Sequence, residues 1–309
     1  GPSECTLKAK SIDFRFVQDT VEVLGLEGQA YPGYTLRMFS DSAARVLKEF
    51  VFTRPVTLSG GGMFPMGDDM KLMKGRIRFD ASAGRVRYPL LGTTLDLGRT
   101  KGEVLISPQW VVVDKMMGTI WDGTFTGRVL AQIDDGDALN GSFVLQDMNL
   151  TSIGKSYDKK MEKATVHGAI EFSSKGGNMN SIQAKGEAAL VHGDLVEIPL
   201  FGFLGEALSN YIPGLGHLIN YKISRADCDF SIEKGYVRTS NFAAQGSNMS
   251  LEGGGWIRLS DLQVNSDFKL GLRGFPGFIT SPVFLLAGGL FQVRGTCLLY
   301  TSDAADEAR

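Results

Sequence analysis

The sequence predicts a mainly β fold, a long curved antiparallel sheet that meanders as a groove, with a few short amphipathic helices. Apolar and polar residues alternate along many short segments. Glycine is abundant, with 39 of 309 residues, whereas proline contributes 10. Glycine at this density favours tight turns between strands. Turn-like sequences separate the alternating segments, for example at residues 81–84 and 134–137.

The alternating segments place their apolar residues on one face of each expected strand. Residues 76–80 put Ile77 and Phe79 opposite three charged side chains, and residues 264–272 are the longest clean case. Strands with one apolar and one polar face are typical of an antiparallel sheet covered on a single side. The residues predicted to form the apolar face are Ile77, Phe79, Val86, Tyr88, Val129, Ile133, Phe143, Leu145, Phe230, Ile232, Phe268, Leu270 and Leu272.

Four segments interrupt the alternation with helix-like spacing: residues 40–50, residues 151–161, the segment from Pro199 to Ile212 and the segment from Pro276 to Leu290. The last two are strongly apolar, yet a helix of about 14 residues measures about 21 Å, which is short of the roughly 30 Å hydrocarbon core of a bilayer. We therefore expect these two segments either to cap an end of the sheet or to contact a membrane at its interface.

The charge balance and the motif search exclude several function classes. Lys and Arg number 32 against 34 Asp and Glu, and this near-balance argues against a nucleic-acid-binding protein. The Asp cluster at residues 134–137 resembles the start of a calcium loop, but the twelfth position counted from Asp135 is Gln146 rather than Glu. The three histidines lack the spacing of a metal site; they are His167, His192 and His217. We expect no metal, no cofactor, no catalytic residue and therefore no enzyme.

The cysteines indicate structure rather than chemistry. Cys5 and Cys228 are too distant to suggest a disulfide framework or a metal site. Cys228 alternates in phase with Phe230 and Ile232, so we interpret it as a small core residue.

Function must then follow from shape, because an apolar sheet face has to be covered. Two apolar helix-like segments can cover only part of so many strands. The apolar lining of a curled sheet would suit lipid acyl chains, because burial of apolar surface contributes roughly 25 cal/mol of free energy per Å². Two alternatives stay open: the same residues pack an ordinary core, or the sheet edges serve as a scaffold for assembling outer-membrane proteins. A carbohydrate-active enzyme would need clustered aromatics, whereas Trp110, Trp121 and Trp256 are dispersed.

An ordered series of segments resembles the C-terminal region of AsmA-like proteins. Residues 186–204 form a strand with a Gly turn, then Ile-Pro-Leu and an apolar stretch. Residues 230–239 resemble the family's strand, Gly turn and strand, and residues 251–259 its glycine-rich strand pair. Residues 291–296 resemble its closing strand. The resemblance covers residues 120–296 well and the earlier residues loosely.

The resemblance implies a bacterial cell-envelope protein that lies in the periplasm, with an inner-membrane anchor outside this fragment. Its relatives are β-groove proteins akin to bridge-like lipid transfer proteins, so the implied partner is phospholipid or another acyl-chain lipid. The implied role is phospholipid transport between the inner and outer membranes and outer-membrane biogenesis, together with unidentified envelope proteins. We expect residues 1–296 to form one continuous segment. Residues 297–309 read like a translated sequencing adapter, and we expect a non-native or disordered tail there.

Overall fold

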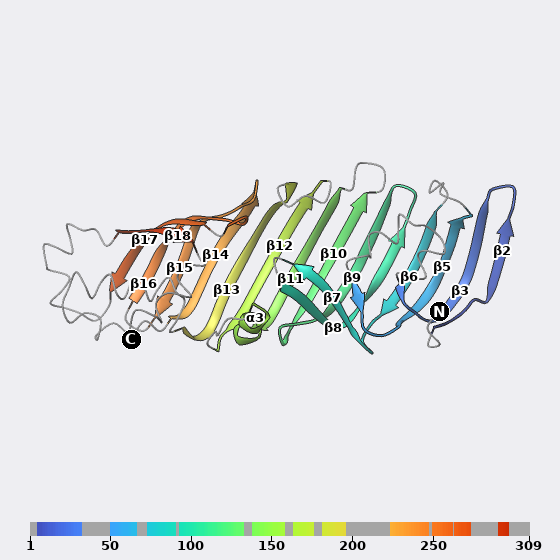
Figure 1. Cartoon of the computed structure of the whole chain (residues 1–309), viewed down its shortest axis with the longest axis horizontal. Helices are drawn as coiled ribbons and strands as arrows, with labels where there is room; N and C mark the ends of the chain where they lie inside the picture. The colour runs from blue at the N-terminus through green and yellow to red at the C-terminus, as the bar shows by residue number, and fades with distance from the viewer. Residues whose placement is uncertain are drawn as a thin grey trace, which may run out of the picture. The chain divides into compact units, whose positions relative to one another are not determined.

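A computed structural model describes residues 5–32, 50–66, 73–90, 93–132, 138–157, 163–175, 181–195, 223–246, 249–261, 263–272 and 290–296. These residues form strands β1 to β18 and one short helix, α3 (Figure 1). Every strand pair described is antiparallel. The predicted fold class, a mainly β chain built as open antiparallel sheet, is therefore confirmed.

The chain divides into two compact units, each described here by itself. Unit 1 contains residues 1–148 with residues 156–158 and 173–177, and unit 2 contains residues 149–155, 159–172 and 178–309. The prediction of one continuous segment over residues 1–296 stays a prediction.

In the sheet of unit 1, β1 and β2 both pair with one edge of β3. From β3 the sheet continues through β5, β6, β8, β9 and β10 to β11. Its strands are β1 (Thr6–Lys8), β2 (Ser11–Arg15), β3 (Thr20–Ala30), β5 (Val56–Pro65), β6 (Lys74–Asp80), β8 (Thr93–Ile106), β9 (Trp110–Ile120), β10 (Gly123–Gln132) and β11 (Leu139–Asn149).

A small ribbon leaves this sheet and forms a second layer. The second half of β8 pairs with β6, whereas its first half pairs with β7 (Arg85–Leu90), which in turn pairs with β4 (Val51–Phe52). Arg99, at the bend between the two halves of β8, has a positive φ of 47°. In Figure 1, β7 and the first part of β8 cross in front of neighbouring strands of the sheet. We call β4, β7 and the first half of β8 the ribbon.

The register assigns the residues of unit 1 to two faces, because directly paired residues share a face. Leu58 pairs with Phe79, and Phe79 pairs with Gly102. In the next row, Ile77 pairs with Val104, which pairs with Val113. The apolar face of unit 1 defined in this way includes Val21, Val23, Leu58, Ile77, Phe79, Val104, Val113, Phe125, Val129, Phe143 and Leu145.

Unit 2 is a meander in which each strand from β13 to β17 pairs with the next, up to β18. Its strands are β12 (Thr165–Ser174), β13 (Gln183–Leu195), β14 (Ile223–Glu233), β15 (Tyr236–Gly246), β16 (Met249–Arg258), β17 (Gln263–Leu272) and β18 (Leu290–Thr296). The register again collects apolar residues on one face, the apolar face of unit 2, which includes Ala188, Leu190, Cys228, Phe230, Ile232, Val237, Phe242, Ala244, Leu251 and Phe268.

Helix α3 (Leu150–Ser156) overlaps the segment predicted at residues 151–161; it begins one residue earlier and ends at Ser156. Asn149 caps it, because its side-chain Oδ1 accepts hydrogen bonds from the backbone N–H groups of Thr151, at 2.9 Å, and Ser152, at 3.4 Å. No helix among the described residues is both long and apolar enough to cross a membrane.

The other predicted interruptions lie outside the described residues. They are most of residues 40–50, the whole segment from Pro199 to Ile212 and nearly all of the segment from Pro276 to Leu290. The predicted tail at residues 297–309 also lies outside them.

Candidate functional site

The predicted apolar residues of β6, β10 and β11 share one face of unit 1. Ile77 and Phe79 come from β6, Val129 from β10, and Phe143 and Leu145 from β11. All five side chains are half-buried. The successive pairings from β6 through β8, β9 and β10 to β11 bring them onto this face, although up to about seventy residues of sequence separate them. Ile133, predicted to join them, lies outside the described residues.

The ribbon covers one part of this face and turns it into an ordinary core. Val86 is 4% exposed and clusters with Val56 and Leu58, and Ile77 and Phe79 pack against the same cluster. Tyr88, next along the same side of β7, stacks against Phe50 with ring centroids 4.7 Å apart. The predicted positions Val86 and Tyr88 therefore belong to the covering layer rather than to the sheet.

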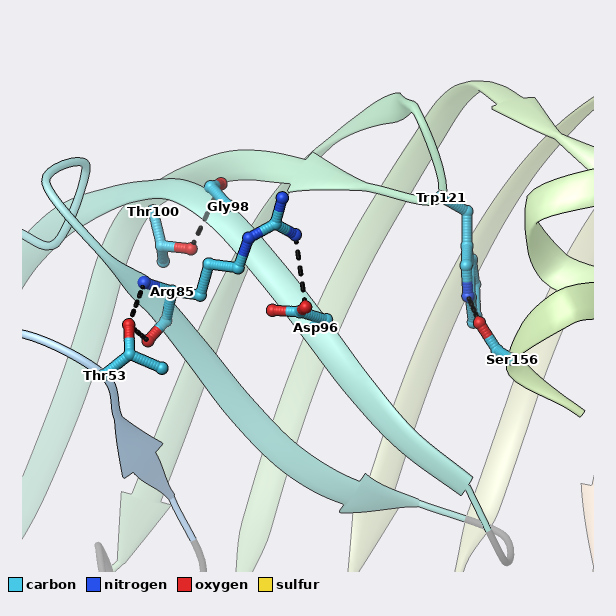
Figure 2. Close-up of polar contacts among 7 residues, drawn as sticks. All are labelled: Thr53, Arg85, Asp96, Gly98, Thr100, Trp121 and Ser156. Atoms are coloured by element: carbon cyan, nitrogen blue, oxygen red, sulfur yellow. Dashed lines mark hydrogen bonds and ion pairs between the residues drawn. The ribbon is translucent and has the colours of Figure 1, made fainter.

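Polar contacts hold the ribbon together (Figure 2). The Thr53 backbone N–H donates to the Arg85 carbonyl at 3.0 Å, and the Arg85 backbone N–H donates to the Thr53 hydroxyl at 2.8 Å. The Arg85 guanidinium lies 3.2 Å from the Asp96 carboxylate across the β7–β8 pair. These contacts, which all involve Arg85, link β4, β7 and β8 within the layer that covers Val56 and Leu58.

Ser156, which ends α3 and belongs to unit 1, is hydrogen-bonded at two strand ends of the same unit. The Trp121 indole N–H donates to the Ser156 hydroxyl at 2.9 Å, as Figure 2 shows. The Thr93 hydroxyl, at the start of β8, donates to the Ser156 carbonyl. Trp121 and Asp122 both have positive φ, 49° and 62°, so they form the two-residue turn that joins β9 to β10.

Away from the ribbon, the face over β10 and β11 keeps apolar surface in contact with solvent. Val129, Phe143 and Leu145 stay half-buried, in contrast with the buried Val86. The Phe143 ring meets the Phe125 ring edge-to-face, with centroids 6.4 Å apart. This part of the face is therefore the one that a ligand in unit 1 could reach.

In unit 2 the predicted residues also share a face. Phe230 and Ile232 are half-buried, whereas Phe268 is 6% exposed and packs edge-to-face against Phe242 at 5.7 Å. Leu270 and Leu272 occupy positions of β17 opposite Leu251 and Met249. The side chains of Leu270 and Leu272 lie outside what the structure describes.

A broad hollow of about 750 Å³ lies in unit 2 beside Phe230. Its walls come from β12 to β16 and include Gly186 and Gly255. The volume lies within the range of small-molecule sites in proteins. Sequence reasoning missed this hollow, although glycines in the middle of alternating strands are a signal for close approach of a neighbour or ligand.

The described residues contain no group of three or more His, Cys, Asp and Glu side chains that could hold a metal ion. Burial raises the pKa of the Cys228 thiol above its usual value, and the neighbouring Asp229 and Asp227 raise it further. A thiol with a raised pKa is a weak nucleophile at neutral pH. Residues 134–137 and His217 lie outside the described part of the chain.

Comparison of the chain with models of protein families, with curated proteins and with solved structures gives no match. The resemblance to AsmA-like proteins therefore stays a prediction.

Proposed function

We propose that this chain is a non-enzymatic segment of a β groove that binds the acyl chains of phospholipid or of another lipid on its apolar faces. The observation that carries the proposal is the register, which aligns apolar side chains from many strands on one face of each unit. An acyl chain needs dry surface rather than specific hydrogen bonds, and each methylene group buried contributes about 0.8 kcal/mol.

The exposed parts of the faces are the ones assigned to lipid. In unit 1 these are Val129, Phe143 and Leu145 on β10 and β11. In unit 2 they are Phe230 and Ile232 on β14. Val86 has no such role in this proposal, because the ribbon buries it against the sheet.

The wider role follows from the resemblance to AsmA-like proteins. The proposal places the chain in the bacterial periplasm, as part of a protein anchored in the inner membrane. There it would contribute to phospholipid transport between the two membranes and to outer-membrane biogenesis. The half-exposed apolar positions support this role because a transport groove must release lipid as well as bind it.

Lipid extraction followed by mass spectrometry tests the proposal with a matched pair of variants. Leu145 and Val144 are neighbours in β11 and lie on opposite faces. Leu145→Asp places a charge on the apolar face, so we expect co-purified phospholipid to fall several-fold. Val144→Asp makes the same kind of change on the polar face and should leave the lipid content unchanged.

Circular dichroism of both variants establishes that each keeps its sheet. A wild-type chain that carries no lipid, and takes up none from vesicles, would sink the proposal. Equal lipid content in the two folded variants would do the same.

The exposed edge of unit 1 favours the scaffold role as a second candidate. Among the described residues β2 pairs with β3 alone; Phe14 within β2 and Phe16 just after it are 59% and 75% exposed. An exposed edge strand can accept an added strand from an unfolded outer-membrane protein. A pull-down of such a segment that survives detergent, and that Ile12→Pro abolishes, would favour this role over lipid binding.

A further inference from the structure

The polar face of unit 1 contains a second, smaller hollow of about 320 Å³. Arg78, Lys101 and Lys115 line it from β6, β8 and β9, and Thr57 and Ser59 line it from β5. Two carboxylates, Asp80 and Glu103, also line it, so three cations and two anions meet there. The register puts this hollow on the face opposite Phe79, because Ser59 pairs with Arg78. It is therefore separate from the apolar face considered for lipid.

The charges around this hollow are predominantly positive, although the whole chain has a net charge of −2. The cations on this face of β6, β8, β9 and β10 are Lys74, Arg76, Arg78, Lys101, Lys115 and Arg128. The anions there are Asp80, Glu103 and Asp114, and Glu27 of β3 pairs with Ser59 on the same face. Asp114 lies 3.7 Å from Arg128, and the two opposite charges balance each other. This pair therefore adds no net charge around the hollow.

Glu103 positions two of the cations that line the hollow. This carboxylate is 6% exposed, with one oxygen 3.6 Å from Arg78 Nε and the other 3.8 Å from Lys115 Nζ. Arg76 Nε lies 3.4 Å from the same carboxylate. One carboxylate thus faces three cations, which leaves net positive charge beside the hollow. The Arg78 and Lys115 side chains are 73% and 74% exposed, so their remaining N–H donors can meet a ligand.

We propose that this hollow binds a phosphate group. Arg78, Lys101 and Lys115 would supply positive charge and N–H donors, and the hydroxyls of Thr57 and Ser59 would add neutral donors. Charge-assisted hydrogen bonds of this kind are the strong ones, and guanidinium and ammonium groups are the usual partners of phosphate. The proposal goes beyond acyl-chain binding and does not depend on it, because the hollow and the lipid positions lie on opposite faces.

The phosphate could be free in solution or belong to a lipid headgroup, and two measurements separate these sources. Isothermal titration with inorganic phosphate detects the free anion. Flotation with vesicles of phosphatidylglycerol detects an anionic headgroup by its excess over vesicles of phosphatidylcholine, whose choline neutralises the phosphate. Saturable binding in either measurement is the expected result, and which of the two shows it identifies the source.

The decisive variant is the double substitution Arg78→Gln and Lys115→Gln. Removal of two charge-assisted donors should weaken binding at least about tenfold. The matched control is Arg225→Gln with Lys234→Gln, which removes the same charge from exposed positions of unit 2. Lys101→Gln serves in place of the double variant if circular dichroism shows that the latter does not fold. Absence of binding in both measurements, or an equal loss in the control, overturns the proposal.

Discussion

Gly118 faces Phe125 across the β9–β10 pair, and the phenylalanine ring lies over the glycine. A Cβ atom on Gly118 would come within 2.7 Å of the ring carbon Cε1. Phe125 is 4% exposed, and its ring is buried in the space that the missing side chain of Gly118 leaves free. The same arrangement recurs at Phe79 with Gly102, Phe143 with Gly127, Phe230 with Gly186 and Phe268 with Gly253.

Gly118→Val should therefore destabilise the chain. The added side chain would collide with the Phe125 ring and force it out of its position, and overpacking of this kind costs about 1–3 kcal/mol. Chemical denaturation measures the loss. Thr126→Val, at an exposed position of β10 on the opposite face, is the control and should stay within about 0.5 kcal/mol of the wild type. Equal stabilities of the two variants would show that the ring can move aside freely.

Val86 and Val129 give a second prediction, because the sequence assigns both to the same apolar face and the structure separates them. Val86 is buried under the ribbon, whereas Val129 is half-buried. Val86→Ala would leave a cavity and should lower the free energy of unfolding by about 2 kcal/mol. Val129→Ala should cost less than about 1 kcal/mol, because solvent or neighbours can fill the space. A larger loss at Val129 in denaturation experiments would contradict the two burial states.

Alternation explains why the face of the main sheet could be predicted and the ribbon could not. Phe79, Val129 and Phe143 follow the pleat of their own strands, and the pleat alone decides which face each occupies. Val86 and Tyr88 show the same alternation, so the local pattern cannot distinguish a strand of the sheet from one that covers it. That difference depends on β8 changing partner from β7 to β6, which is a long-range pairing.

The register shifts could not be predicted from the sequence either. Lys115 has a φ of 51° and lies at a β-bulge between β8 and β9, where Gly102 of β8 faces both Lys115 and Met116 of β9. Lysine gives no local signal for this conformation, in contrast with glycine or asparagine. The bulge matters for the smaller hollow, because Lys115, the residue at the bulge, contacts Glu103.

Asp80 leads to a prediction about acid stability. The Ser82 side chain and the Ser82 backbone N–H, which donates to Asp80 Oδ1 at 2.8 Å, hold the pKa of this carboxyl below its usual 3.8. Lys101 lowers this pKa further, whereas partial burial opposes the shift.

Because the folded-state pKa is the lower one, Asp80 stabilises the fold above pH 3.8 and loses this contribution as the pH falls through the folded-state value. Asp80→Asn removes the titration, so the drop in melting temperature on acidification should become smaller than in the wild type. A melting curve measured from neutral pH to below pH 3.8 tests this. Identical acid dependence of the two proteins would exclude a role for the Asp80 turn.

Glu103 gives the last prediction, which concerns the balance between attraction and desolvation. Its carboxylate lies within 4 Å of Arg76, Arg78 and Lys115, whose side chains are largely exposed. Glu103→Gln would leave these cations facing one another on neighbouring strands. Since each pair is weak at exposed positions, we expect a total loss of about 1 kcal/mol at low salt. Salt screens the repulsion, so the loss should shrink when NaCl rises from about 0.05 M to about 0.5 M.

Glu252→Gln, at an exposed position of unit 2, is the matched control and should show neither effect. Desolvation opposes this attraction, because a carboxylate that is 6% exposed has lost most of its hydration. A variant as stable as the wild type, or more stable, at both salt concentrations would mean that desolvation outweighs the attraction of the three cations. In that case, Glu103 would hold Arg78 and Lys115 beside the hollow at a cost to stability, which is the behaviour of a residue retained for binding rather than for folding.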